Sequence, residues 1–184
     1  MEAFEGIVKR IVNALNGAEV EYMLTGALAA SHYGLPRTTM DVDIVVKVFR
    51  EDVQTRLVSA LRKAGLRVDE KKIDAAFKSG FRIVTFSDTK SPFTVDIIFS
   101  RRKLKKKAGT ILGLPTFYQT PEELILAKLR MIKATIPKER AIKDEDDVKA
   151  ILKFTKVDIN AIKKQAKRNN TLTILENMMP QSIS

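Results

Sequence analysis

The chain of 184 residues is 45% hydrophobic and 30% charged, the balance of a globular domain that can bury a core without metal or disulfide staples. It has no cysteine and a single histidine, His32, which excludes disulfides, thiolate metal sites and multi-histidine metal sites. The 33 lysines and arginines against 22 acidic residues give a net charge of +11, which favours polyanionic partners such as nucleic acid or nucleotides.

The sequence offers no segment that is suited to crossing a membrane. Its apolar runs are all shorter than the roughly 20 residues that a bilayer span requires. Residues 1–16 form a charged amphipathic pattern instead of the apolar centre of a signal peptide. We therefore expect a cytoplasmic protein without a membrane partner.

The first third of the chain predicts helices that alternate with short strands. Apolar residues recur at helical spacing in two segments, and each of these segments is followed by a glycine. Asp41-Val42-Asp43 opens a run that is nearly continuous in apolar residues, the pattern of a strand buried on both faces. In chain order, we expect a helix at 2–15, a strand at 20–24, a helix at 27–33, a strand at 42–48 and a helix at 51–64.

The rest of the chain predicts a β-hairpin followed by helices. The segment 87–92 is rich in turn residues and favours antiparallel pairing of the strands on either side of it. A Thr-Pro-Glu-Glu sequence at 120–123 has the pattern of a capping box with proline at the first helical position. We expect strands at 81–86 and 93–99, an extended stretch at 110–117, and helices at 121–134, 144–154, 158–168 and 171–179.

These elements predict an α/β (α+β) fold. Residues 1–118 would form a core in which a small mixed or antiparallel β-sheet is flanked by helices. Residues 119–184 would form a C-terminal helical portion packed on that core. We find no internal repeat and no low-complexity linker.

Three aspartates are placed where they could share a metal ion. Asp41 and Asp43 alternate with Val42 at the start of a strand, so their carboxylates point to the same face of the sheet. Asp96 lies among apolar residues in a later strand, where an ionised side chain is costly without a partner. If the strands are neighbours, the carboxylates converge. Hard oxygen ligands without histidine or cysteine select Mg²⁺ or Mn²⁺, the ions that accompany nucleotide phosphates.

The order of motifs around these aspartates resembles the nucleotidyltransferase superfamily related to DNA polymerase β. Gly26-Ala27 lies between a strand and a short helix, where a backbone N–H group can approach a phosphate. An Arg-x-Thr-x-Asp-x-Asp string runs from Arg37 to Asp43, and the carboxylate of Asp96 follows. The superfamily has a Gly-Gly or Gly-Ser, a short helix, an Asp-x-Asp or Asp-x-Glu, and a third carboxylate on a later strand. Ala27 departs from this pattern and lacks the hydroxyl that could contact the γ-phosphate.

A closer resemblance is to the minimal bacterial and archaeal nucleotidyltransferases that include the AbiEii-type toxins. In that group the Asp-x-Asp is followed by a helix that bears a lysine and then by an Asp-x-x-Asp. Lys128 and the pair Asp144 and Asp147 stand in the matching order. The resemblance covers residues 20 to about 155.

The resemblance implies a nucleotidyltransferase fold and transfer of a nucleoside monophosphate from a nucleoside triphosphate to an acceptor hydroxyl, with release of pyrophosphate by two-metal catalysis. Asp41, Asp43 and Asp96 would be catalytic and would bind Mg²⁺ or Mn²⁺. The residues expected to bind the nucleotide are Gly26, Ala27, Arg37, Thr39 and Lys128.

The net charge favours RNA as the acceptor, and the resemblance to the toxin branch implies an RNA with a tRNA-like end. The basic residues after the Asp96 strand would contact it, namely Arg101, Arg102, Lys105, Lys106 and Lys107. Because the toxin branch modifies tRNA ends or partner proteins, a cognate antitoxin is another expected partner. The alternative is a non-catalytic, basic nucleic-acid-binding module that keeps the nucleotidyltransferase fold.

Several of these residues also have simpler structural interpretations. Arg37 could cap the preceding helix or pair with Asp41, and Lys128 could be a solvated helix lysine. Asp144 could be an N-cap and Asp147 a residue that interacts with the helix dipole. The basic run could be an ordinary solvated surface.

Overall fold

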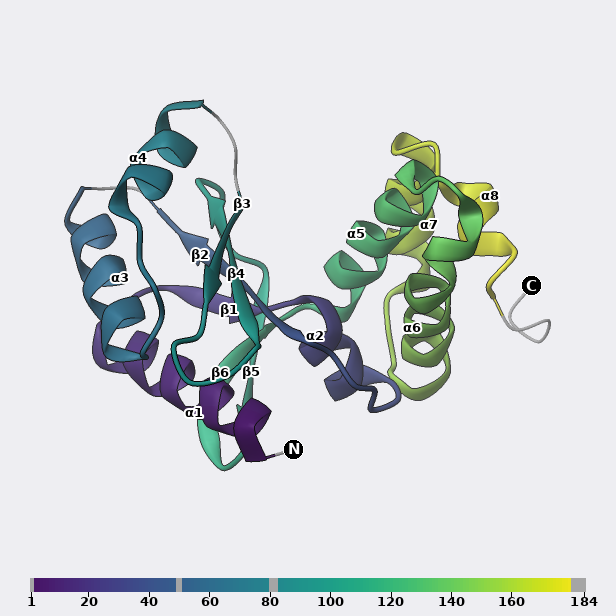
Figure 1. The fold of residues 1–184 in the computed structure, drawn as a ribbon. Helices are drawn as coiled ribbons and strands as arrows, with labels where there is room; N and C mark the ends of the chain where they lie inside the picture. Colours follow the sequence, from purple (N-terminus) through teal and green to yellow (C-terminus); the bar gives the residue numbers. More distant parts are fainter. Residues whose placement is uncertain (1, 49–50, 80–82, 180–184) are drawn as a thin grey trace. The chain divides into compact units, whose positions relative to one another are not determined.

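A computed structural model of the protein describes residues 2–48, 51–79 and 83–179. The chain forms two compact units, each built from two separate stretches of sequence. Met1–Gly26 and Thr38–Gln119 form a unit of sheet and helices, and Ala27–Arg37 and Thr120–Ser184 form a helical unit (Figure 1).

In the described part of the sheet unit, six strands form one mixed sheet with the order β3-β4-β2-β1-β6-β5. The pairs β2·β4 and β1·β6 are parallel, and the other neighbours are antiparallel. Helices α1, α3 and α4 lie on one side of the sheet (Figure 1). This arrangement confirms the expected sheet flanked by helices. The elements are α1 (Glu2–Gly17), β1 (Tyr22–Leu24), β2 (Asp41–Lys47), α3 (Glu51–Lys63), α4 (Glu70–Ser79), β3 (Ile83–Ser87), β4 (Thr94–Ser100), β5 (Lys106–Ile111) and β6 (Leu114–Gln119).

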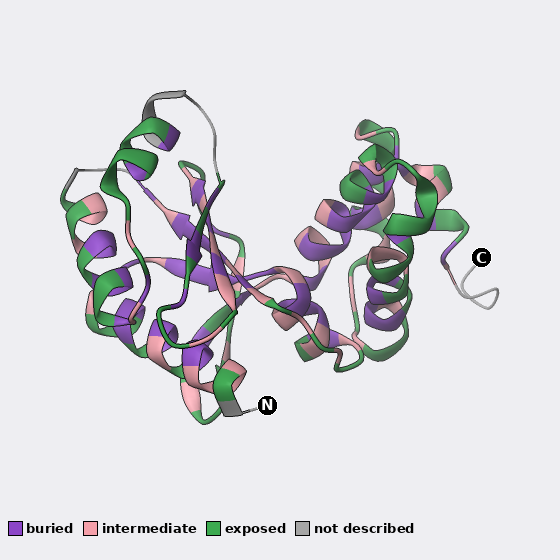
Figure 2. Ribbon diagram, viewed as in Figure 1, coloured by how far each residue is buried: buried purple, intermediate pink, exposed green. Residues whose placement is uncertain are grey.

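Alternation along β2 separates an apolar face from a polar one. Val42, Ile44 and Val46 are fully buried, and so are residues at helical spacing in α1 and α3 (Figure 2). Because successive strand residues point to opposite faces, Asp41 and Asp43 face away from that core. A small apolar cluster covers the next part of their face; its members are Met23, Val45, Leu104 and Ile98. The two carboxylates therefore remain only half-buried.

The β3–β4 hairpin forms as expected, with antiparallel pairing from Ile83 opposite Ile98 to Ser87 opposite Thr94. Residues 81 and 82, the start of the first expected strand, lie outside the described residues. The extended stretch expected at 110–117 is instead a second hairpin, formed by β5 and β6.

Two features of the sheet unit have weak sequence signals. The β5–β6 turn places Leu112 and Gly113 at φ angles of 51° and 81°, and leucine is not a residue that marks such a turn. Helix α4 was not expected, because among its residues with described burial the apolar Ile73 and Ala76 lie between many charged ones. Both elements depend on tertiary contacts more than on local preference.

The loop after β3 is fixed to α1 by a buried ion pair. The Asp88 side chain has no exposed surface and accepts hydrogen bonds from Arg10 Nη2 and Ser91 Oγ, each at 2.6 Å. Burial alone would raise the pKa of Asp88, but the hydrogen bonds from Ser91 and Arg10 and the arginine charge outweigh it, so the pKa is lowered. Asp88 is therefore ionised at neutral pH and joins the helix layer to the end of β3.

The helical unit packs α5 against α6 and α7. Thr120 precedes α5 as expected, but its hydroxyl makes no capping hydrogen bond. Its carbonyl accepts the first backbone hydrogen bond of the helix, from Leu124 N at 2.9 Å. Among the described residues, no helix has both the length and the apolar character to span a membrane. The elements are α2 (Gly26–Tyr33), α5 (Pro121–Ala134), η1 (Lys138–Ala141), α6 (Ile142–Phe154), α7 (Ile159–Arg168) and α8 (Leu172–Glu176).

Helix α2 groups with the helical unit, which differs from the expected division of the chain at residue 118. Thr155 Oγ1 donates a hydrogen bond to the Tyr33 carbonyl at 2.5 Å. Gly34 lies so close to α6 that a Cβ added there would be 2.9 Å from the Cβ of Ala150. These contacts hold the end of α2 against α6.

Candidate metal centre

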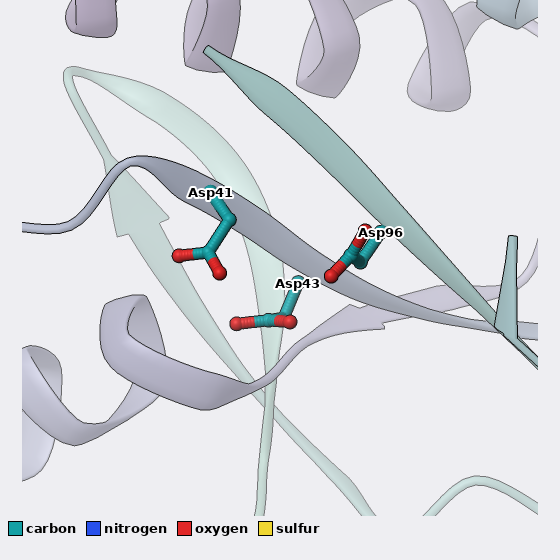
Figure 3. A group of neighbouring side chains, drawn as sticks. All are labelled: Asp41, Asp43 and Asp96. Atoms are coloured by element: carbon teal, nitrogen blue, oxygen red, sulfur yellow. The ribbon is translucent and has the colours of Figure 1, made fainter. Parts of the chain in front are cut away.

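Three carboxylates from two neighbouring strands form a cluster on the polar face of the sheet. Asp41 and Asp43 lie on β2 and Asp96 lies on β4, where the parallel register places Asp43 directly opposite Asp96. One oxygen of each carboxylate lies within 4.8 Å of one oxygen of each of the others. Figure 3 shows the three side chains grouped along the two strands. The expected convergence of these aspartates is therefore present.

The chemistry of this cluster fits a hard divalent cation. Three like charges at this separation repel one another unless a cation lies among them. Within the described residues, Asp96 Oδ1 is buried and has no hydrogen-bond partner, although a buried oxygen acceptor normally has one. Ligands that are all oxygen favour Mg²⁺ or Mn²⁺ over the metals that select histidine or cysteine. A bound cation would offset the repulsion among the three carboxylates and would give Asp96 Oδ1 a partner.

Gly26 lies directly against one of these carboxylates. Its φ of 57° is in the left-handed region, and a Cβ at this position would lie 1.9 Å from Asp43 Oδ2. Thr25 N also donates a hydrogen bond to the Asp43 carbonyl at 3.0 Å. The position therefore requires glycine for two independent reasons, its backbone conformation and the space that Asp43 occupies.

Thr39 contacts the carboxylate cluster, whereas Ala27 groups with the helical unit. The Thr39 hydroxyl donates a hydrogen bond to Asp41 Oδ1. Ala27 belongs to the helical unit and is buried, with 5% exposure. Of the five residues expected to bind the nucleotide, the structure thus brings Gly26 and Thr39 into contact with the carboxylate cluster.

Arg37 and Lys128 belong to the helical unit, where both pair with Asp147. Arg37 Nε and Nη2 donate to the two oxygens of Asp147 at 2.9 and 3.0 Å. Lys128 Nζ lies 2.8 Å from Asp147 Oδ2 and 2.7 Å from Asp144 Oδ1. The side chains of Lys128 and Asp147 are 6% and 5% exposed. Two cations and two carboxylates thus form a largely buried, electrically balanced group, which we call the helical-unit charge cluster.

This cluster corrects three of the simpler interpretations. Lys128 is not a solvated helix lysine, because its side chain is buried. Asp144 is not an N-cap, since α6 begins at Ile142 with Ala141 as its N-cap, and Asp144 instead binds Lys128 from the first turn. Asp147 lies beyond the first turn of α6, where the helix dipole acts most strongly, and instead forms buried ion pairs.

The basic segment after β4 is only partly a solvated surface. Arg101, Arg102, Lys105 and Lys107 are exposed, whereas Lys106 Nζ lies 3.4 Å from Glu21 Oε1 and 4.3 Å from the centre of the Phe117 ring. Burial would raise the pKa of Glu21, but hydrogen bonds and charge from Lys47 and Lys106 outweigh it, so the pKa is lowered. No local pattern marks Glu21 as a paired residue, because its partners lie 26 and 85 residues further along the chain.

The fold that carries these features is the nucleotidyltransferase fold. The solution structure of the antibiotic-resistance factor ANT(2″)-Ia superposes with a TM-score of 0.67 at 11% identity, over 96% of this chain and 97% of that one. The crystal structure of ANT(2″)-Ia in complex with adenylyl-2″-tobramycin gives 0.65 at 12% identity, over 91% and 98%. An antigenic nucleotidyltransferase-like protein from Paracoccidioides brasiliensis gives 0.58 at 14% identity, over 95% and 93%.

At these identities the likeness establishes the fold alone. No family model and no curated protein matches the sequence. The residues of the site, and not the fold, therefore determine which activity the protein can have.

We expect Gly26→Ala to weaken binding of Mn²⁺ by at least about tenfold, as loss of support for a ligand commonly does, because the new methyl group displaces Asp43. Mn²⁺ titration followed by electron paramagnetic resonance measures this loss. Gly113→Ala is the matched control, since Gly113 also has a positive φ but no atom lies within 4 Å of its added Cβ. Equal affinity in wild type and Gly26→Ala would contradict the close approach.

We expect Asp147→Asn to destabilise the protein by on the order of 3 kcal/mol, because it leaves two buried or half-buried cations without their shared carboxylate. Urea unfolding followed by circular dichroism measures the change. Asp146→Asn, the same substitution at the exposed neighbouring position, should change stability by less than about 0.5 kcal/mol. Similar losses in both variants would show that the helical-unit charge cluster is not a stabilising element.

Proposed function

We propose that the protein is a metal-dependent nucleotidyltransferase. It transfers a nucleoside monophosphate from a nucleoside triphosphate to an acceptor hydroxyl and releases pyrophosphate. The observation that carries this proposal is the convergence of Asp41, Asp43 and Asp96 within 4.8 Å on the sheet of a nucleotidyltransferase fold. None of the three expected carboxylates is missing, which favours an enzyme over a binding module that has lost its chemistry.

The three aspartates would hold Mg²⁺ or Mn²⁺. When bound, the metal supplies charge neutralisation at the phosphates and lowers the pKa of the acceptor hydroxyl. Asp96 would also take the acceptor proton, since an ionised carboxylate has a second oxygen beside the one that binds the metal. The acceptor oxygen then forms a bond to the α-phosphorus, and the bond from that phosphorus to the pyrophosphate oxygen breaks.

The remaining site residues contribute in different ways to the proposed reaction. Gly26 allows the backbone to lie close to Asp43, in a position where a side chain would collide with the Asp43 carboxylate. Arg37 retains 28% exposure, and its planar guanidinium suits phosphate oxygens. Lys128 is 6% exposed and bound to two carboxylates, so its contribution to nucleotide binding would act through Asp147, the partner that it shares with Arg37. Ala27 contributes backbone and no hydroxyl.

RNA is the acceptor that the surface charge of the protein favours. The net charge of +11 and the exposed Arg101, Arg102 and Lys107 provide an electrostatic surface for a polyanion. A toxin role with a neighbouring antitoxin rests on the AbiEii resemblance of the sequence. A small hydroxyl compound is the competing acceptor, because ANT(2″)-Ia, of similar fold, has been captured with adenylyl-2″-tobramycin.

We expect Asp43→Asn to abolish transfer, with a loss of at least about a hundredfold, as for other groups that stabilise transition-state charge. It should also weaken Mn²⁺ binding while leaving the fold intact or more stable, because it removes one of three repelling charges. Mass spectrometry after incubation with Mg²⁺, each nucleoside triphosphate and total tRNA measures transfer. Asp74→Asn, at an exposed position of α4, is the control. Full activity of Asp43→Asn would overturn the proposal.

If RNA is the acceptor, its binding should be strongly salt-dependent. Single strands release counterions with a slope of about −0.7 per phosphate neutralised in a plot of log affinity against log salt. Replacing the exposed Arg101, Arg102 and Lys107 with glutamine should therefore make the slope less negative by about 2 and leave nucleotide binding unchanged.

The matched control replaces the exposed Lys9, Lys71 and Lys72 with glutamine, which changes the net charge equally. Fluorescence anisotropy with labelled RNA between about 50 and 200 mM salt gives both slopes, since the effect spans powers of ten in this range. Salt-insensitive RNA binding, together with transfer to a small hydroxyl compound, would reassign the acceptor and leave the metal chemistry in place.

A further inference from the structure

The three carboxylates of the cluster are held by different contacts. Asp43 lies against Gly26, and Asp96 Oδ1 has no hydrogen-bond partner among the described residues. Asp41 Oδ1 accepts a hydrogen bond from the hydroxyl of Thr39, two residues earlier in the chain. Thr39 and Asp41 are both half-buried, so solvent competes only in part for this bond. Thr39 is thus directly linked to the cluster by its side chain.

The Thr39 contact limits the orientation of the Asp41 carboxylate without using all of its acceptor capacity. An ionised carboxylate has two oxygens and about four lone-pair positions. A hydrogen bond to Oδ1 restricts rotation of the carboxylate about its last torsion angle, and further lone pairs on both oxygens remain for a cation. Such hydrogen bonds to the ligands of a metal commonly set both their geometry and the metal affinity.

The hydroxyl of Thr39, which donates the hydrogen bond to Asp41, carries no charge. An arginine or lysine at position 39 would offset the negative charge that attracts a cation. A hydroxyl orients the carboxylate and leaves the full charge of the cluster in place. The contact therefore suits a group that prepares Asp41 for a divalent cation more than a group that neutralises phosphate.

We propose that Thr39 is a positioning residue that orients Asp41 for the divalent cation. Thr39 does not itself contact the nucleotide in this role, which revises the nucleotide contact expected from the sequence. The inference rests on the proposed function, because it requires that the cluster of Asp41, Asp43 and Asp96 binds a metal.

The test measures Mn²⁺ affinity of the full-length protein without nucleotide, by electron paramagnetic resonance. Thr39→Val keeps the shape of the side chain and removes the hydroxyl, and it should raise the Kd for Mn²⁺ about tenfold or more. Thr39→Ser keeps the hydroxyl and should bind Mn²⁺ nearly as well as wild type. Thr110→Val makes the same change at an exposed position of β5, which β1 and β6 separate from β2, and should have no effect.

A second variant without the hydroxyl and a measurement of ATP binding distinguish a role of Thr39 at Asp41 from misfolding or a nucleotide contact. Thr39→Ala also removes the hydroxyl, and it replaces Thr39→Val if the latter unfolds in a thermal scan. Binding of ATP in the presence of EDTA is measured for each folded variant. It should be unchanged if Thr39 acts through Asp41.

The possible outcomes separate this inference from the proposed function. If wild type binds Mn²⁺ and the variants without the hydroxyl bind it equally well, the positioning role is overturned and the metal cluster stands. Weaker binding of ATP in EDTA with unchanged Mn²⁺ affinity would likewise overturn it and assign Thr39 to the nucleotide. If wild type itself fails to bind Mn²⁺, the proposed metal-dependent function and this inference both fail.

Discussion

The parallel pairing of β2 with β4 is the constraint on which the candidate centre depends. It places Asp43 opposite Asp96 on the polar face, while the intervening valines and isoleucines of both strands are buried on the other face. A slip of one residue would exchange the two faces and bury the charges. The apolar core therefore fixes the register, and the register brings the carboxylates together. The free energy that holds three like charges near one another comes from side chains buried on the opposite face of the sheet.

The two clusters of charged side chains differ in composition. In the helical unit, Arg37 and Lys128 are matched by Asp144 and Asp147, so the cluster is neutral and largely buried. In the sheet unit, the three carboxylates lie beside a glycine and a neutral hydroxyl, and within the described residues the buried Asp96 Oδ1 has no hydrogen-bond partner. A neutral cluster stabilises its own fold. A cluster of three carboxylates is suited to a divalent cation from solution.

Local pattern was sufficient to predict much of this arrangement. The alternation of Asp41, Val42 and Asp43 determines which side chains share a face, and the sequence order of the motifs suggested the fold. Contacts between distant residues were not predictable in this way. Arg37 and Asp147 are 110 residues apart, and a buried lysine such as Lys128 has the same local sequence pattern as an exposed one. Their partners are determined by helix packing, which depends on the whole chain.

The interleaving of the two units restricts how the protein can be divided or rearranged. Helix α2 lies between β1 and β2 in sequence but groups with the helical unit, so the polypeptide crosses between units at residues 26–27, 37–38 and 119–120. A fragment that starts at Thr120 would lack α2, whose Ala27, Ala29, Ala30 and Tyr33 are buried in the full chain. It would also lose Arg37, one of the two cations bound to Asp147. Exchange of the helical unit for another module would therefore need three matched junctions, and a simple terminal fusion could not achieve it.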